Sequence, residues 1–262
     1  MTDAALTDSA LYRLLAWSSP GYPTGAFSYS HGLEWAVETG SVTDMQGLIE
    51  YVTGVLSRGG GWIDAVLFSQ AWRATARARD KTAPNRGGPA ALAESGALVE
   101  PGAPAQSDPL AELDSLAQLA AAFRGSSETA LESRQQGAAF LDITRKAWPH
   151  PILDTFATRQ AGAPVAHCIA VAAACAAHEI GLTPALHSYI QAVAANLVSA
   201  GARLIPLGQT QAQIAIARLS PDITAIAERA LATSLDDLGT AAPAIELCSL
   251  RHETQYTRLF RS

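Results

Sequence analysis

Residues Val165 to Leu182 read VAHCIAVAAACAAHEIGL, the longest alanine-rich apolar stretch of the 262-residue sequence. Alanine has the highest intrinsic helix propensity, so the stretch predicts a helix. It also contains His167, His178 and Glu179, and alanine is too weakly hydrophobic to carry these polar groups across a bilayer. We therefore expect a helix buried in a protein core and no membrane-spanning segment.

The composition of the whole chain agrees with a helical fold. Hydrophobic residues make up 48% of the sequence, but aromatic residues only 6%. Much of the apolar content is alanine, which favours close-packed helices over strands rich in Val, Ile and Tyr. No convincing strand pattern or internal repeat appears. The sequence therefore predicts an all-α protein, and its length can bury a sizeable core.

Helical patterns continue on both sides of this stretch. Residues 45–56 place five apolar side chains on one face, behind Thr43 or Asp44 as the N-cap. The glycines at 59–61 are expected to end that helix. Pro221 stands where the first turn of a later helix would begin. The chain thus reads as a series of helices joined by short connections.

Residues 82–106 differ from the rest of the chain. They are crowded with Ala, Gly and Pro and show no sustained period. Such a segment buries too little apolar surface to offset the entropy lost on ordering. We expect a flexible surface loop.

Charge and cysteine content limit the possible partners and compartment. The formal charge of -6 gives no electrostatic footprint for nucleic acid or anionic membrane. Cys168, Cys175 and Cys248 are too few and too widely spaced for a disulfide framework. The first residues include Asp3 and Asp8 and lack the basic and apolar segments of a signal peptide. These features predict a cytoplasmic protein that binds neither nucleic acid nor membrane.

Familiar catalytic motifs are missing. A phosphate-binding loop combines glycines with a lysine, and neither Lys81 nor Lys146, the two lysines of the chain, lies in that context. The pairs His178-Glu179 and His252-Glu253 lack the second histidine that a zinc protease needs one turn later. We expect no enzyme activity and no cofactor.

One helical face leaves an alternative open. Cys168, Cys175 and Glu179 fall on the same face, with His178 close to Cys175, so metal ligands could converge there. The alternative function is therefore a helical metal-binding or hydrolytic enzyme that uses this face. Packing is the stronger interpretation, because free cysteine behaves as a small buried hydrophobe.

Three long segments resemble one protein family. Residues 16–34, AWSSPGYPTGAFSYSHGLE, resemble the N-terminal motif of UreF, S-P-x-x-P-x-G-x-F-S-Y-S-x-G-L-E. Residues 203–209, RLIPLGQ, and 249–262, SLRHETQYTRLFRS, are similar to further parts of that family, as are residues 134–137. Residues 82–106 depart from it and look like an insertion.

The resemblance implies a single compact all-α domain over residues 1–262 with a role in urease maturation. A UreF-like protein dimerises and joins the accessory protein UreD, also called UreH, and the GTPase UreG on apo-urease. It scaffolds these partners while nickel is delivered in a GTP-dependent step, and GTP hydrolysis belongs to UreG. This chain would then be a nickel-insertion chaperone without catalysis of its own.

The resemblance also selects the residues expected at partner surfaces or in structural motifs. They are Pro20, Gly25, Phe27, Ser28, Tyr29, Gly32, Glu34, Arg203, Pro206, Gly208, Gln209, Arg251, His252, Glu253, Gln255, Tyr256, Arg258, Leu259, Phe260 and Arg261. The glycines have backbone uses, and the aromatic residues are typical anchors of interfaces. A tight helix-loop-helix corner needed for folding is the alternative for the N-terminal motif.

The last segment, residues 251–262, combines arginines with aromatic residues. Its sequence predicts few contacts with the hydrophobic core. We expect an extended C-terminal tail that becomes ordered on the UreD-type partner. Packing of the tail on its own helices is the alternative.

Overall fold

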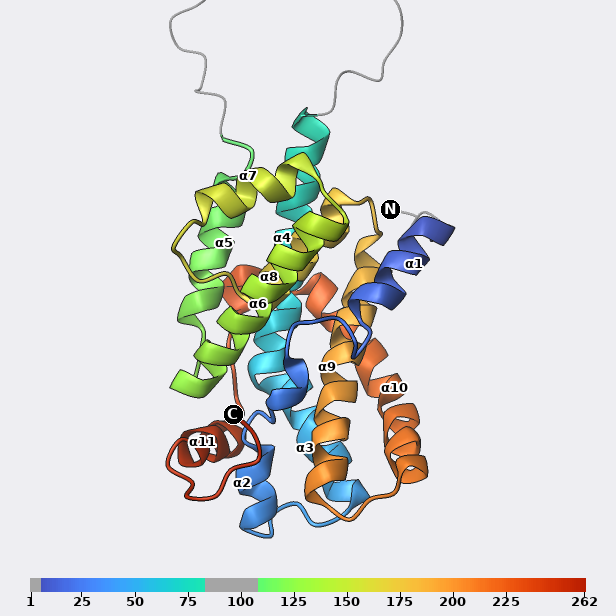
Figure 1. Ribbon diagram of the computed structural model, residues 1–262, viewed down its shortest axis with the longest axis vertical. Helices are drawn as coiled ribbons and strands as arrows, with labels where there is room; N and C mark the ends of the chain where they lie inside the picture. The colour runs from blue at the N-terminus through green and yellow to red at the C-terminus, as the bar shows by residue number, and fades with distance from the viewer. Residues whose placement is uncertain (1–5, 83–107) are drawn as a thin grey trace, which may run out of the picture.

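The computed structural model describes residues 6–82 and 108–262, and these residues form an all-helical fold (Figure 1). No strand occurs within those two ranges. The α-helices are α1 (Asp8–Trp17), α2 (Leu33–Glu38), α3 (Met45–Arg58), α4 (Gly60–Thr82), α5 (Ala111–Ala122), α6 (Ser127–Ala147), α7 (Pro151–Arg159), α8 (His167–Ala177), α9 (Leu182–Leu204), α10 (Gln209–Ala232) and α11 (Pro243–His252). Two short 3-10 turns, η1 (Ala26–Ser28) and η2 (Leu235–Asp237), complete them. The all-α prediction is confirmed.

The alanine-rich stretch forms α8, at the centre of the core. Every residue from Cys168 to Ala177 is buried, and α4 and α6 are the neighbours that cover α8 most extensively. The small side chains let these helices approach closely, so the predicted buried helix is confirmed. None of the described helices is long and apolar enough to cross a membrane.

The helices are arranged along one long axis (Figure 1). Helices α3, α4, α9 and α10 run roughly along this axis and pack on one another. In one half of the molecule α5 and α8 pack on α4, and α6 and α7 pack on α8, whereas α2 and α11 pack together in the other half. Both lysines lie in the first of these halves, Lys81 in the last turn of α4 and Lys146 in the last turn of α6.

Local signals account for both boundaries of α3. The carboxylate of Asp44 accepts a hydrogen bond from the N–H of Gly47 at 2.8 Å, so Asp44 and not Thr43 is the N-cap of α3. Helix α3 ends at Arg58, before the run of glycines, as expected. Helix α4 begins directly at Gly60 and continues to Thr82. Thr82 is therefore helical, and the other residues of the predicted 82–106 loop lie outside the described residues.

The expected helix start at Pro221 is wrong. Helix α10 runs from Gln209 to Ala232 with Pro221 inside it. Proline removes one backbone hydrogen bond and crowds the preceding turn, but here it is exposed while Leu219 and Ile223 beside it are buried. Packing of this buried face against α3 and α9 keeps the helix continuous through the proline.

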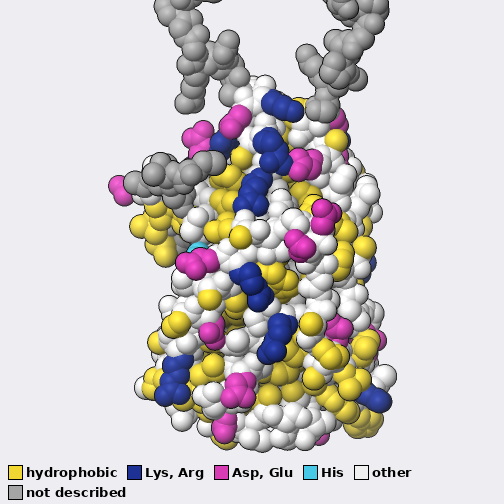
Figure 2. All heavy atoms as spheres, turned by 180° about the vertical axis from the view of Figure 1, so that it is seen from behind, with side chains coloured by type: hydrophobic (Ala, Val, Ile, Leu, Met, Phe, Trp, Pro, Cys, Tyr) yellow, Lys and Arg dark blue, Asp and Glu magenta, His cyan; other side chains and the backbone are white. Residues whose placement is uncertain are grey.

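Arginines tie the ends of helices to their neighbours. Arg73 and Arg79 of α4 donate to the carbonyl of Leu231 in α10 and of Ala176 in α8, both at 2.7 Å. Arg229 donates to the carbonyl of Ser57 in α3. These carbonyls lie in last turns, where a helix carries partial negative charge and favours cations. The face turned away in Figure 1 accordingly shows basic side chains along the long axis with acidic ones beside them (Figure 2).

Candidate functional site

Three segments that are far apart in the sequence meet where α2 and α11 pack together. Arg203, at the end of α9, donates to the carbonyl of Phe27 at 2.8 Å and stacks over the ring of Phe260 at 4.4 Å. The N–H of Arg261 donates to the carbonyl of Ser28 at 2.8 Å. We call this assembly of residues 27–34, Arg203 and residues 252–262 the motif cluster.

Glu34 holds the tail against α2. It lies in the first turn of α2 and is 6% exposed. One of its carboxylate oxygens accepts from the N–H of Leu259 at 2.6 Å, and the other accepts from the N–H of Phe260 at 2.9 Å. An ionised acceptor makes such bonds stronger than those between neutral groups. A single buried carboxylate thus fixes the backbone of two tail residues.

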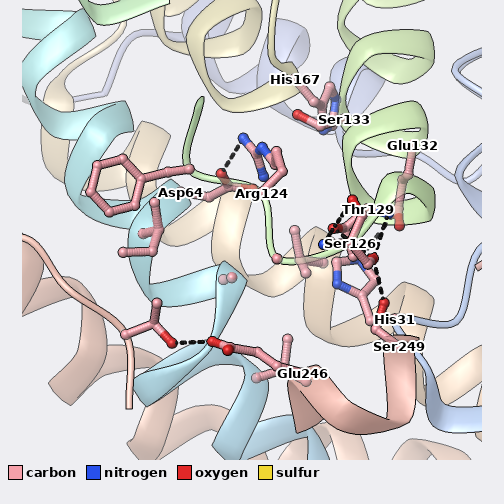
Figure 3. Close-up of a pocket in the computed structure, with 18 of the residues that line it drawn as sticks. His31, Asp64, Arg124, Ser126, Thr129, Glu132, Ser133, His167, Glu246 and Ser249 are labelled. Carbon is pink, nitrogen blue, oxygen red and sulfur yellow. Dashed lines mark hydrogen bonds and ion pairs between the residues drawn. The ribbon is translucent and has the colours of Figure 1, made fainter. Parts of the chain in front are cut away.

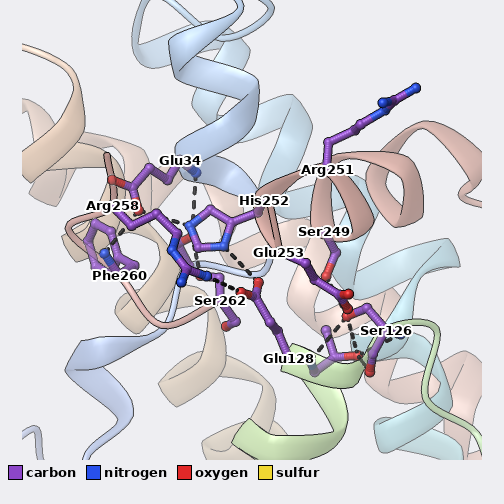
Figure 4. A network of polar contacts seen from close by, with 12 residues as sticks. Glu34, Ser126, Glu128, Ser249, Arg251, His252, Glu253, Arg258, Phe260 and Ser262 are labelled. Carbon is purple, nitrogen blue, oxygen red and sulfur yellow. Dashed lines mark hydrogen bonds and ion pairs between the residues drawn. The ribbon is translucent and has the colours of Figure 1, made fainter. Parts of the chain in front are cut away.

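His252 joins Glu34 to a second buried carboxylate (Figure 4). Its Nδ1 lies 2.7 Å from Oε2 of Glu128, and its Nε2 lies 3.0 Å from Oε2 of Glu34. A neutral imidazole has only one N–H to donate. The two contacts therefore require either an imidazolium or one protonated carboxyl group. Arg258 adds an ion pair to Glu128 at 2.7 Å, so a protonated His252 makes this set of four groups electrically neutral.

The expectation that the tail has little core to join is wrong. Phe260 and Ser262 are buried, and the carbonyl of Ser262 accepts from the N–H of Ser30 at 2.6 Å. The tail therefore packs on its own chain, as in the alternative given by the sequence analysis. Its outer side is free, since Tyr256 is fully exposed and Leu259 is 64% exposed. Binding of a partner by that outer side stays a prediction.

The N-terminal motif forms a tight corner before α2. Gly25 and Gly32 both have a positive φ, near +76° and +75°. A Cβ at Gly32 would lie 2.5 Å from the backbone nitrogen of Ser249 in α11, whereas nothing lies within 4 Å of that position at Gly25. Gly32 therefore permits both the turn and the close approach of α11. These contacts support the alternative that the corner is needed for folding.

Several predicted residues lie outside the motif cluster or face away from it. Pro206, Gly208 and Gln209 form the connection into α10, where the N–H of Gly208 donates to Gln211. Pro20 and Arg251 are exposed.

Two further predicted residues of the tail face the protein. Glu253 accepts from the N–H and hydroxyl of Ser127, both at 2.8 Å, and these bonds at the start of α6 lower its pKa. Oε1 of Gln255 is buried without a hydrogen-bond partner among the described residues.

Residues of α6 complete the motif cluster, and the sequence analysis named none of them as site residues, although Gln135 lies in the family-like segment 134–137. The hydroxyl of Tyr29 donates to Gln135. Glu132 accepts from Gln136 at 2.8 Å and from the hydroxyl of Ser262 at 2.9 Å. Glu128, Glu132 and Gln135 recur at about one helical turn, a spacing that places them on one face. The missed signal was this polar stripe, which a hydrophobic pattern assigns to solvent.

His31 links the motif cluster to a cavity. Its Nε2 lies 2.9 Å from Oε1 of Glu132. Burial is the largest effect on the pKa of His31 and lowers it, but the charge and hydrogen bond of Glu132 and the charge of Asp64 outweigh it, so the pKa is raised. The raised pKa favours the protonated form of His31 beside Glu132 at the edge of the cavity.

The cavity has a volume of about 280 Å³ and lies among α4, α6 and α11 (Figure 3). Asp64 and Arg124 form an ion pair across 2.8 Å on one side. His167 and Ser133 are also part of the wall (Figure 3). Burial lowers the pKa of His167 to about 4, so its imidazole is neutral at pH 7.

The cysteine face of α8 is part of the core. Cys168 and Cys175 are fully buried, and burial raises the pKa of both thiols. His178 lies 3.1 Å from the carbonyl of Trp148, and burial lowers its pKa to about 4. Across residues 6–82 and 108–262, no group of three or more His, Cys, Asp or Glu residues is placed to hold a metal ion. The geometry of this face is that of packing.

Comparison with known proteins places the chain beside one family. The UreF family model matches residues 42–220. The urease accessory protein UreF of Rhodopseudomonas palustris strain TIE-1 is 45% identical over 98% of this chain and 95% of its own length. The proteins of the same name from Granulibacter bethesdensis and Bradyrhizobium diazoefficiens are 46% and 42% identical, over 97% and 99% of this chain and 95% and 94% of their own lengths. The similarity therefore extends over nearly the whole of each chain.

Proposed function

The chain belongs to the UreF family of urease accessory proteins, and from that premise we propose that it is a non-catalytic nickel-insertion chaperone. It scaffolds a UreD/UreH-type protein and a UreG-type GTPase on apo-urease and supports GTP-dependent nickel delivery and urease maturation. The GTP is hydrolysed by the GTPase partner. The chain acts in the cytoplasm and forms a homodimer.

The observation that carries this proposal is the division of the motif cluster into two sides. Its inner side consists of polar groups that bind one another, such as His252 with Glu34 and Glu128. Groups that are already paired in this way position a surface and are not free for catalysis. Its outer side presents side chains that nothing in the described chain covers. This division supports a binding role.

The outer side of the tail and the exposed residues of the neighbouring helix α11 combine apolar side chains with an arginine. Leu247 and Leu250 of α11 and Tyr256 and Leu259 of the tail are exposed large hydrophobic residues, and Arg251 lies next to Leu250. We call these five residues the α11–tail surface. Aromatic residues and arginine dominate binding energy at protein interfaces, so this surface suits the UreD/UreH-type partner.

The proposal is tested by removing the anchors of the α11–tail surface. The double variant Tyr256→Ala/Leu259→Ala should weaken pull-down of the UreD/UreH-type partner by about tenfold or more and should reduce urease activation. Both side chains are exposed, so the melting temperature should stay the same. The matched control is Ile214→Ala/Leu235→Ala, which removes two exposed apolar side chains from elsewhere. Equal binding by the two double variants would contradict the assignment of this surface.

The homodimer and the GTPase contact need tests of their own. Light scattering on the purified chain measures the dimer, and a mass of one chain at micromolar concentration would contradict it.

The contact with the GTPase is tested by co-elution of the chain, the UreD/UreH-type protein and the GTPase in the presence of GTP. Absence of the GTPase from that complex would contradict the scaffold.

A further inference from the structure

The cavity beside the motif cluster is large enough for more than water. A buried water needs roughly 10 to 15 Å³ of cavity volume measured with a water-sized probe, and this cavity measures about 280 Å³. Pockets that bind small molecules have volumes from about 300 Å³ upward. The size therefore suits one compact organic molecule.

The cationic groups of the cavity wall are already paired. Arg124 binds Asp64 at 2.8 Å, and the hydroxyl of Tyr189 donates to the other oxygen of Asp64 at 3.2 Å. His31 binds Glu132 at 2.9 Å. An anionic ligand would lose its hydration without gaining an unpaired opposite charge. This pairing disfavours anions.

Carboxylates of the wall are also paired or solvated. Asp64 and Glu132 are held by Arg124 and His31, and Glu246 is partly exposed and accepts from the hydroxyl of Thr240. A cation would therefore find no buried, unpaired carboxylate. The charges of the wall together favour an uncharged ligand.

One polar group of the wall lacks a partner. Ser133 is 8% exposed, and its Oγ forms no hydrogen bond with any described residue. Buried hydroxyls are almost always hydrogen-bonded. A serine in a helix can donate to the backbone carbonyl one turn earlier, but Ser133 makes no such bond. His167 is another residue of the same wall (Figure 3). The ring of His167 packs against Phe140 and Tyr189, and the residue is partly exposed at the cavity wall.

The wall also carries apolar side chains, among them Val55, Ile63, Phe123, Val193 and Ile245. We propose that the cavity binds a small uncharged molecule with an apolar body and one carboxamide-type group, which donates one hydrogen bond and accepts another at Ser133 and His167. An amide supplies both roles at adjacent atoms, and its body replaces water along the apolar wall.

Three probes with the same ring test the class of ligand: benzamide, benzoate and ethylbenzene. Each is titrated into the full chain, with amide chemical shifts recorded by NMR. We expect benzamide to bind at least about tenfold more tightly than the other two, and to shift residues around Ser133. Benzoate tests the preference for an uncharged group, and ethylbenzene tests the need for a polar one. No benzamide binding at millimolar concentration, or equal binding of all three probes, would overturn the proposal.

A serine variant tests the named contact. Ser133→Ala should weaken benzamide binding about five- to tenfold, the value of one hydrogen bond. Its melting temperature should be unchanged or higher, because the lost hydroxyl has no partner in the protein. Ser115→Ala, whose hydroxyl is exposed and bonded within α5, should leave binding unchanged. Wild-type affinity in Ser133→Ala, or a crystal structure soaked in benzamide with only ordered water at Ser133, would overturn the proposal. The test uses no partner, so its failure leaves the scaffold function intact.

Discussion

At the scale of single residues, the imidazole of His252 lies between two buried carboxylates that would otherwise repel each other. Its two nitrogens contact Glu34 and Glu128 at 3.0 and 2.7 Å. Glu34 also binds the tail backbone. The packing of the tail therefore depends on a histidine whose partners lie 218 and 124 residues away in the sequence.

Replacing His252 with phenylalanine keeps a planar ring but removes both hydrogen bonds. Leaving a buried polar group without its hydrogen-bond partner typically costs about 1 to 3 kcal/mol, and more for a charged group, so the loss of two such bonds should lower the free energy of unfolding by about 3 kcal/mol in urea denaturation. His187→Phe makes the same change at a partly exposed position of α9 and should cost less than about 1 kcal/mol. Equal losses would show that the carboxylates do not depend on His252.

The buried imidazole of His167 predicts acid sensitivity. Its pKa is about 4 in the folded protein and about 6.5 when unfolded. Burial is the main cause of this lowering and Arg124 adds to it, while Asp64 and Glu132 oppose it. The unfolded state binds the proton more tightly, so the contribution of His167 to stability is complete above pH 6.5 and is lost as the pH falls toward 4.

The size of this acid effect is on the order of 3 kcal/mol for a shift of this kind. We expect the wild type to lose more unfolding free energy than His167→Gln between pH 7 and pH 4.5. His178, whose pKa is also about 4, titrates in both proteins, so the difference between them isolates His167. Parallel pH profiles for the two proteins would contradict the prediction.

At the scale of elements, α2 has a glycine in the left-handed region at each end. Gly32 precedes the helix with a φ of +75°, and Gly40 follows it with a φ of +72°. Only Gly32 also faces a neighbouring backbone, since a Cβ there would lie 2.5 Å from the nitrogen of Ser249. The two positions therefore separate the cost of conformation from the cost of contact.

Gly40→Ala should cost about 1 to 2 kcal/mol, the penalty of a left-handed conformation alone. Gly32→Ala adds a collision with the backbone of α11, which must move, so we expect a loss above ~3 kcal/mol in urea denaturation. Binding of the UreD/UreH-type partner should fall only in Gly32→Ala, because that variant displaces α11. Similar losses in the two variants would mean that α11 is not fixed by this contact.

At the scale of the whole molecule, the expectation that the chain has no nucleotide site can be tested directly. Lys81 and Lys146 both lie in the last turns of their helices, whereas phosphates are bound at helix N-termini. We expect no heat of binding in calorimetry with GTP and magnesium, using the UreG-type GTPase as the positive control. Micromolar binding by the chain alone would overturn the non-catalytic proposal.

The sequence predicted the helices better than their contacts. Asp44 and the glycines after Arg58 act on their own neighbours, so local patterns located α3. The contact of Ser30 with Ser262 joins residues 232 positions apart, and nothing in either local segment indicates it. The burial of Glu128 and Glu132 is not predicted either, because polar residues on a helix are normally assigned to its solvent-facing side. The sequence predicts a helix start at Pro221, but packing of α10 on α3 and α9 outweighs the local preference of proline for a first helical turn.

The positions of the two lysines have a practical consequence for experiments on assembly. Side-chain amines are the usual points of attachment for sensor surfaces and fluorescent dyes. Lys81 and Lys146 are exposed, and α4 and α6 both end in the half of the molecule away from α11 (Figure 1). Amine coupling through these side chains would therefore orient the protein with the α11–tail surface facing the solution, where an added partner can reach it.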